Sequence, residues 1–165
     1  METTAVRLWK RIGRDERLAA ATNFFREPPS ELVGSALATI VKARHLRPQV
    51  ARAMSADEQA RALASVLDPG EPLAASLLVA LHLGDRRPML ATFLDAAGVP
   101  HEGGLLKDDA AMAPLGEEAA RAGVNALLSA YPAEQVRTYL NTLWLQDPER
   151  WAALEKSGLS PASAT

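Results

Sequence analysis

The segment LAASLLVALHL, Leu73–Leu83, decides what kind of fold this chain of 165 residues adopts. Ser76 and His82 are its only polar residues, so a helix formed by this segment would be apolar on nearly every side. Such a helix is stable in water only when other helices surround it. Its length is far below the roughly 20 residues that a membrane span needs. The segment therefore predicts a buried central helix.

The segments on both sides of Leu73–Leu83 have the apolar spacing of amphipathic helices. Their apolar residues recur at intervals of three and four, and no segment alternates apolar and polar residues for long enough to predict a strand. We expect an all-α fold, a compact array of about seven to nine short helices around the Leu73–Leu83 helix. The expected helical faces include Leu18–Phe25, the set Val33, Leu37, Ile40 and Val41, and the ranges Ala60–Leu67, Leu90–Ala97, Ala120–Tyr131 and Val136–Leu143.

Proline and capping residues mark where these helices begin. Proline suits the first helical turn because its missing N–H group would have no partner there anyway. Ser55 with Glu58 three residues later has the pattern of a capping box. The length suits one domain, expected at residues 1–158 and followed by a mobile tail at 159–165. The helix starts marked by proline are expected near Pro29, Pro48, Pro72, Pro88, Pro132 and Pro148.

The composition excludes several classes of site. Cysteine is absent, which rules out disulfides, thiolate metal sites and a cysteine nucleophile, and which fits a reducing cytoplasm. The charged N-terminus has no continuous apolar core, so no signal peptide and no membrane association are expected. Phosphate-binding glycine motifs and a serine nucleophile elbow are also absent from the sequence. We expect a cytoplasmic protein that uses no cofactor.

The stretch TFLDAAGVPHEGGLLKDDA, Thr92–Ala110, is the densest cluster of chemically active side chains. Gly98 is expected to end the preceding helix in the left-handed conformation, with Val99 packing on Leu94. The EGG sequence then predicts a turn with positive φ. Three interpretations remain open: a solvated connector, a metal or acid–base site, and a loop that binds another protein. The candidate site residues are Asp95, His101, Glu102, Asp108 and Asp109.

The N-terminal third of the chain is basic although the whole is slightly acidic. Residues 1–52 hold ten Lys and Arg against five Asp and Glu, whereas the net charge of the chain is −2. If Ala5–Phe25 were one helix, a basic stripe would lie along one face and could contact the phosphates of a nucleic acid. The alternative is a solvated face, kinked at Gly13. The basic stripe comprises Arg7, Lys10, Arg11, Arg14 and Arg17, and Lys42, Arg44, Arg47 and Arg52 could extend it.

The remaining histidines are expected to be structural. His45 ends the helix expected at Glu31–His45, and His82 ends the central helix, where cations complement the helix dipole.

The block RRPMLATFLDAAGVPHEGGLLKDD, Arg86–Asp109, resembles sequences of an uncharacterised family of bacterial all-α hypothetical proteins. That family has no assigned function, so the resemblance implies no activity and no site residues.

The leading functional hypothesis is a non-enzymatic protein-interaction module, acting through a helical face or by self-association. It rests on the absence of catalytic signatures and on the many helical faces. The second hypothesis is a nucleic-acid-associated protein that uses the basic stripe. The third is an enzyme or small-molecule binder centred on residues 95–109.

Overall fold

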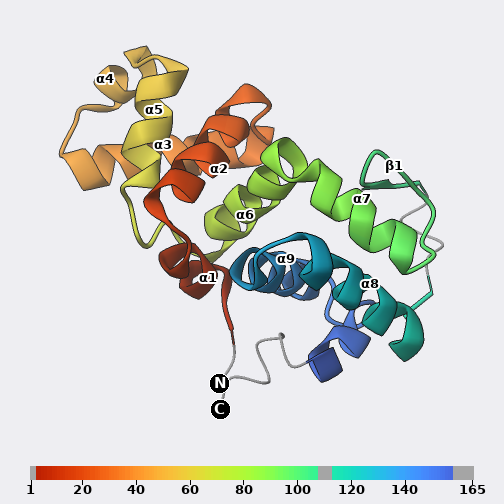
Figure 1. Ribbon diagram of the computed structural model, residues 1–165. Coiled ribbons are helices and arrows are strands. Elements are labelled where there is room, and N and C mark those ends of the chain that lie inside the picture. Colours follow the sequence, from red (N-terminus) through yellow and green to blue (C-terminus); the bar gives the residue numbers. More distant parts are fainter. Residues whose placement is uncertain (1–2, 108–112, 158–165) are drawn as a thin grey trace. The chain divides into compact units, whose positions relative to one another are not determined.

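The computed structural model describes residues 3–107 and 113–157, and it is all-α apart from one short hairpin (Figure 1). The hairpin consists of β1 (His101–Glu102) and β2 (Leu105–Leu106). The predicted all-α fold is therefore confirmed. The helices of the described residues are α1 (Ala5–Arg11), α2 (Arg14–Arg26), α3 (Ser30–Arg44), α4 (Pro48–Ala53), α5 (Ala56–Ala64), α6 (Glu71–Asp85), α7 (Arg87–Ala96), α8 (Glu117–Ala130), α9 (Ala133–Gln146) and the 3-10 helix η2 (Ala152–Ser157).

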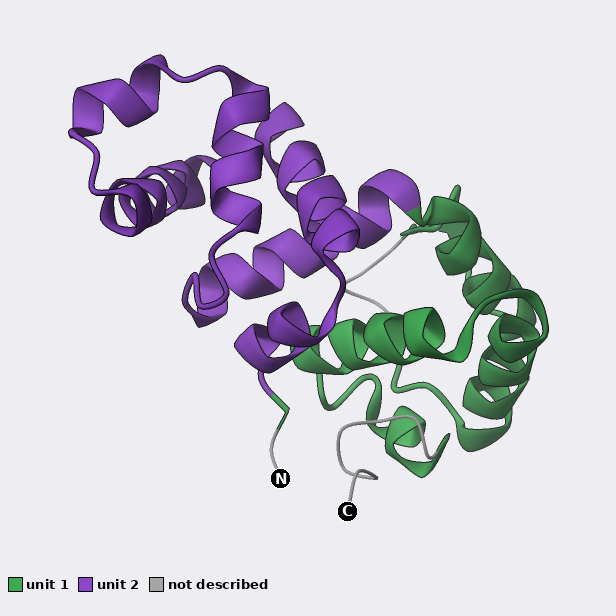
Figure 2. Ribbon diagram, turned by 60° about the vertical axis from the view of Figure 1, so that its left-hand side comes forward, with its two compact units in different colours: residues 1–3, 86–165 green, residues 4–85 purple. Residues whose placement is uncertain are grey.

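The chain forms two compact units, which Figure 2 shows in separate colours. Unit 2 comprises residues 4–85 and contains α1 to α6. Unit 1 comprises residues 1–3 and 86–165 and contains the hairpin and the remaining helices. The expectation of a single domain at 1–158 stays a prediction, and the expected tail at 159–165 lies outside the described residues.

The predicted start signals are correct for five of the six prolines. Pro29 and Pro132 are N-caps, and the other three prolines occupy the first helical turn of α4, α6 and α7. Pro148 is the exception, because it lies in a turn that leads into the 3-10 helix η2 rather than into an α-helix. The capping box is confirmed: Ser55 Oγ accepts the N–H of Glu58 at 3.2 Å, and Glu58 Oε2 accepts the N–H of Ser55 at 2.8 Å.

Helix α6 is the core of unit 2 and extends two residues beyond the predicted segment at each end. It packs against α1, α2 and α3, and its leucines Leu73, Leu77, Leu78 and Leu81 are buried. Trp9 of α1 is fully buried as well, and its indole N–H donates to the carbonyl of Val66 at 2.8 Å. These contacts explain why the most apolar segment of the sequence is helical at the centre of this unit.

Helices α7, α8, α9 and η2 enclose an aromatic core in unit 1. Phe93 lies edge-on to Tyr139, with ring centroids 5.7 Å apart, and 6.0 Å from the ring of Trp151. All three side chains are buried, and burial holds the pKa of Tyr139 well above its usual range. Gly123 of α8 faces the Phe93 ring, which lets α7 and α8 approach closely.

Candidate interaction surface

Helix α7 ends as the sequence predicts, in a Schellman motif at Gly98. Gly98 has φ 68°, its N–H donates to Asp95 O at 3.1 Å, and the Val99 N–H donates to Leu94 O at 2.9 Å. This pair of bonds satisfies carbonyls that the end of a helix leaves without partners. Val99 and Leu94 are both buried. The first half of the candidate loop is therefore a helix terminator.

The second half of the loop is the β1–β2 hairpin, which the sequence analysis did not predict. Gly103 and Gly104 form its two-residue turn with φ 56° and 87°, so the positive φ expected for the EGG sequence is confirmed. A Cβ on Gly104 would lie 2.9 Å from Leu90 Cβ, because the turn packs directly on α7. The strands are only two residues long, too short for an alternating pattern to reveal them.

His101 links the hairpin to α7 through both of its ring nitrogens. Its Nδ1 accepts the Gly104 N–H at 3.1 Å, which places the proton of the neutral ring on Nε2. Nε2 then donates to Asp95 Oδ1 at 2.8 Å. With both nitrogens engaged and only 12% of the side chain exposed, the imidazole has a structural role that needs no ligand.

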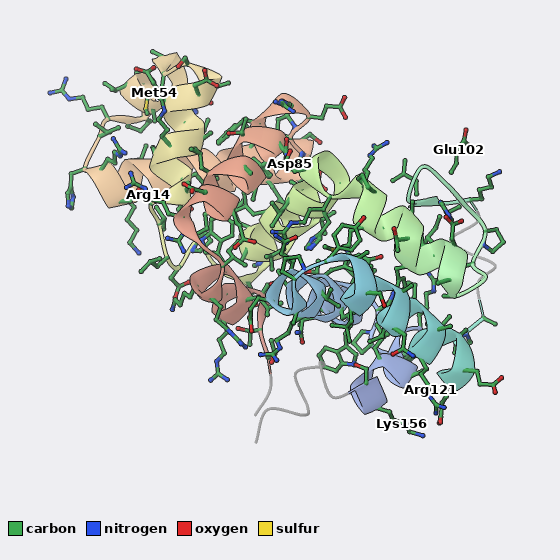
Figure 3. The ribbon with its side chains drawn as sticks, in the orientation of Figure 1. Arg14, Met54, Asp85, Glu102, Arg121 and Lys156 are labelled. Carbon is green, nitrogen blue, oxygen red and sulfur yellow. The ribbon has the colours of Figure 1, made fainter. Side chains whose placement is uncertain are left out.

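In the described part of the candidate loop, Glu102 does not complete a site around His101. Glu102 is exposed and its carboxylate points away from the hairpin (Figure 3). Asp108 and Asp109 lie outside the described residues. Within residues 3–107 and 113–157, no group of three or more His, Asp or Glu side chains is arranged to hold a metal ion. The geometry supports the interpretation of this loop as a connector.

The other two histidines are parts of helices. His45 follows α3 in the left-handed conformation, with φ 53°, and ends the helix one residue earlier than predicted. His82 is buried in α6, and its Nδ1 donates to the carbonyl of Leu78 at 2.7 Å. Among the residues that the structure describes, neither histidine belongs to a group of three or more side chains that could hold a metal ion.

The single N-terminal helix considered for the basic stripe does not form. The chain breaks at Ile12 and Gly13, and Gly13 is the N-cap of α2, so the stripe is divided between α1 and α2. Arg17 is used internally, because its guanidinium donates to Ala64 O at 3.1 Å and to Ile12 O at 2.8 Å. Lys10 forms an ion pair with Asp68 at 3.5 Å. These bonds are tertiary contacts that spacing alone cannot reveal.

The more uniform basic segment lies at the end of α3 and in α4. No Asp or Glu occurs between Leu32 and Ala56, and the four Lys or Arg of this segment are all exposed. Val50 of α4 is also 48% exposed, an apolar side chain among the cations. From the sequence, this segment is predicted only as an extension of the N-terminal stripe. The cations are Lys42, Arg44, Arg47 and Arg52.

Helix α3 differs from an ordinary surface helix because its middle carries no charge. The ten residues LVGSALATIV, Leu32–Val41, contain no Asp, Glu, Lys or Arg, yet only Ala36 and Ile40 among them are buried. A helix at the surface usually presents charged residues to water. The spacing of Val33, Leu37, Ile40 and Val41 predicts an apolar helical face, and the structure leaves all of these residues but Ile40 partly exposed. The charge-free run was the signal that could have identified this surface.

One side of α3 forms a continuous exposed face, which we call the α3 face. Spacings of three, four and seven residues place its members together on the helix. Val41 is half-buried and the others are exposed, with one charge at each end of the face. The α3 face consists of Glu31, Gly34, Ser35, Ala38, Val41 and Lys42.

A shallow cavity of about 370 Å³ lies along α2, outside the α3 face. Its polar groups satisfy one another: the Asn23 amide donates to Asp85 Oδ1 at 3.1 Å, and Arg26 donates to Asn23 Oδ1 at 3.2 Å. A Cβ on Gly84 would lie 2.1 Å from Asn23 Nδ2, so Asn23 packs directly on the backbone of α6. The arrangement is explained by the packing of α2 on α6 and requires no small molecule.

Comparison with protein-family models, with curated proteins and with solved structures finds no match for this chain. In the part of the chain that the structure describes, no helix has the length and apolar character needed to span a membrane. The interpretation of function therefore depends on the surfaces described above.

Proposed function

We propose that this chain is a non-enzymatic module that acts by protein–protein interaction, with the α3 face as its binding surface. The observation that carries the proposal is the run Leu32–Val41 of α3, which contains no charged residue. Only Ala36 and Ile40 of its ten residues are buried. Interfaces are depleted in charged residues at their centre and polar at their rim. The α3 face has this pattern, since its charges, Glu31 and Lys42, lie at its two ends.

The surroundings of α3 support a binding role. Exposed Val50 lies on the next helix, α4, whose only other apolar side chains are alanines and the proline at its start. Met54, at the turn between α4 and α5, is half-buried (Figure 3). A surface that carries no charge at its centre and charges at its ends can bind a protein by burying its centre and pairing its rim.

The proposed location is the cytoplasm. A chain without cysteine cannot form the disulfides that stabilise proteins in an oxidising compartment. A domain of this size needs neither a disulfide nor a metal to stabilise its core. Fluorescence microscopy of the tagged full chain in its own cells would test the location directly, and a signal confined to the cell envelope would contradict it.

A site-specific crosslinking experiment tests the interaction itself. The photoreactive residue p-benzoylphenylalanine replaces Ala38, at the centre of the α3 face, in cells that express the full chain. The matched control carries the same residue at Ala122, which is an exposed alanine in the middle of α8. We expect a discrete crosslinked product for position 38 and none for position 122. Absence of a product at position 38, or equal products at both positions, would contradict the proposal.

A second candidate function is nucleic-acid binding through the basic segment of α3 and α4. The specific observation in its favour is the run from Leu32 to Ala56, with four exposed cations and no carboxylate. Binding of this type weakens steeply with salt because counterions are released from the phosphates. Replacing Arg44, Arg47 and Arg52 by Gln should then abolish binding of generic RNA at about 50 mM salt. If the unmodified chain binds no RNA or DNA under that condition, this candidate is excluded.

A further inference from the structure

We infer that the α3 face binds the same face of a second copy of this chain, with the two α3 helices antiparallel. This inference rests on the proposed function and names its partner. It follows from the order of charges along α3, from the absence of charge between them, and from the requirement that a symmetric interface be self-complementary.

The two charges of the α3 face have opposite signs and lie at opposite ends. Glu31 is in the first turn of α3 and Lys42 in the last. They are eleven residues apart, close to three helical turns, so they lie on the same side of the helix at a separation of about 16 Å. Between them the exposed members are Gly34, Ser35 and Ala38.

An antiparallel pair of α3 helices places opposite charges next to each other at both ends of the contact. In the register that centres the two faces, Glu31 of each copy lies opposite Lys42 of the other, and Ser35 lies opposite Ala38. A twofold axis repeats every contact, as in an isologous dimer. The helix dipoles also oppose one another in this arrangement. No charged side chain is buried, because both ion pairs lie at the rim.

Other partners fit the α3 face less well. A parallel pair would place Glu31 opposite Glu31 and Lys42 opposite Lys42, and like charges that face each other are unfavourable. A partner surface of one sign would attract one end of the face and repel the other. A second copy in antiparallel orientation places an opposite charge beside Glu31 and beside Lys42.

The expected association is weak and concentration-dependent. The contact between two faces about 16 Å long is well below the area of standard protein interfaces, so a dissociation constant in the micromolar to millimolar range is expected. Small residues at the centre of the face allow the helix axes to approach closely, which improves packing over this short contact.

Sedimentation equilibrium of the purified full chain, over a wide range of concentrations, tests the inference by a charge swap. Glu31→Lys and Lys42→Glu should each weaken dimerisation about tenfold, because two exposed pairs change from attraction to repulsion. The double variant should restore the affinity to within about threefold of the unmodified chain, since the pairs are reformed with reversed sign. Glu149→Lys makes the same change of charge at an exposed position of unit 1 and should leave the dissociation constant of the dimer unchanged.

The outcomes separate this inference from the proposed function. A chain that stays monomeric at every concentration overturns the inference, but a crosslink from position 38 to a different protein would leave the proposed function standing. A dimer that the single reversals do not weaken, or that the double variant does not restore, also overturns the antiparallel α3 contact. Thermal unfolding of each variant confirms that the charge changes leave the fold intact.

Discussion

Replacing Gly123 by alanine should destabilise unit 1, although alanine is the better helix former. A Cβ at this position of α8 would lie 2.6 and 2.7 Å from two carbon atoms of the Phe93 ring and 3.2 Å from Phe93 O. The ring cannot simply move aside, because it is buried against Tyr139 and Trp151. The carbonyl is part of the α7 backbone, so α7 and α8 must separate.

The expected free-energy change follows from two opposing effects. Overpacking of a closely packed core costs about 1–3 kcal/mol. Alanine in place of glycine inside a helix contributes about 1 kcal/mol in the other direction. Because the clash involves both the ring and the backbone of Phe93, overpacking should dominate, with a net loss of roughly 1–2 kcal/mol.

Gly34→Ala is the matched control for this prediction. Gly34 is also inside a helix, but a Cβ there would meet no atom within 4 Å. Only the helix propensity changes, so Gly34→Ala should stabilise the fold by about 0.5–1 kcal/mol. Urea unfolding followed by far-UV circular dichroism, at a concentration below that of self-association, measures both changes. If Gly123→Ala is as stable as the unmodified chain or more stable, the close packing of α7 on α8 described here is wrong.

Four further substitutions test the local geometry. His45→Gly should stabilise the fold by about 1 kcal/mol in urea unfolding, since φ 53° strains any residue with a Cβ; a loss of stability would contradict the left-handed cap. The Ser55 backbone N–H, and then the Ser55 hydroxyl, lower the pKa of Glu58, so the stabilisation by this carboxylate is present above its usual pKa of 4.5 and is lost as pH falls through the lowered value. In an NMR titration, Ser55→Ala should raise the pKa of Glu58 part of the way back, and an unchanged value would rule out the hydroxyl as a cause. His101→Ala should cost about 1 kcal/mol through its two hydrogen bonds, whereas Glu102→Ala should change stability by less than about 0.5 kcal/mol, and equal effects of the two would refute the structural role of the imidazole.

Local signals in the sequence predicted several features of the fold correctly. The central helix follows from the apolar run Leu73–Leu83, and the end of α7 follows from Gly98 with Val99 and Leu94. These features depend on neighbours along the chain, where apolar periodicity and the conformational freedom of glycine determine the structure. The hairpin was missed because two-residue strands are stabilised by the turn and by packing on α7, not by a pattern of their own.

The surfaces were harder to predict because their chemistry depends on tertiary contacts. Arg17 belongs to the basic stripe by spacing, but its guanidinium bonds to the carbonyl of Ala64, which is far away in the sequence, as well as to that of nearby Ile12. Leu37 and Val41 have the spacing of a core face, and only the packing of α3 determines that they stay partly exposed. Periodicity identifies an apolar face, but it does not determine how much of that face another element covers.

The most direct test of the α3 face is a concentration series of ¹H–¹⁵N NMR spectra of the full chain, from the micromolar to the millimolar range. Amide shifts in α3 should change with concentration, with the largest changes near Ala38, while those of α8 around Ala122 stay unchanged. Glu31→Lys should suppress these changes, and the double variant with Lys42→Glu should restore them. Spectra that do not depend on concentration, or changes that occur mainly outside α3, would contradict the account.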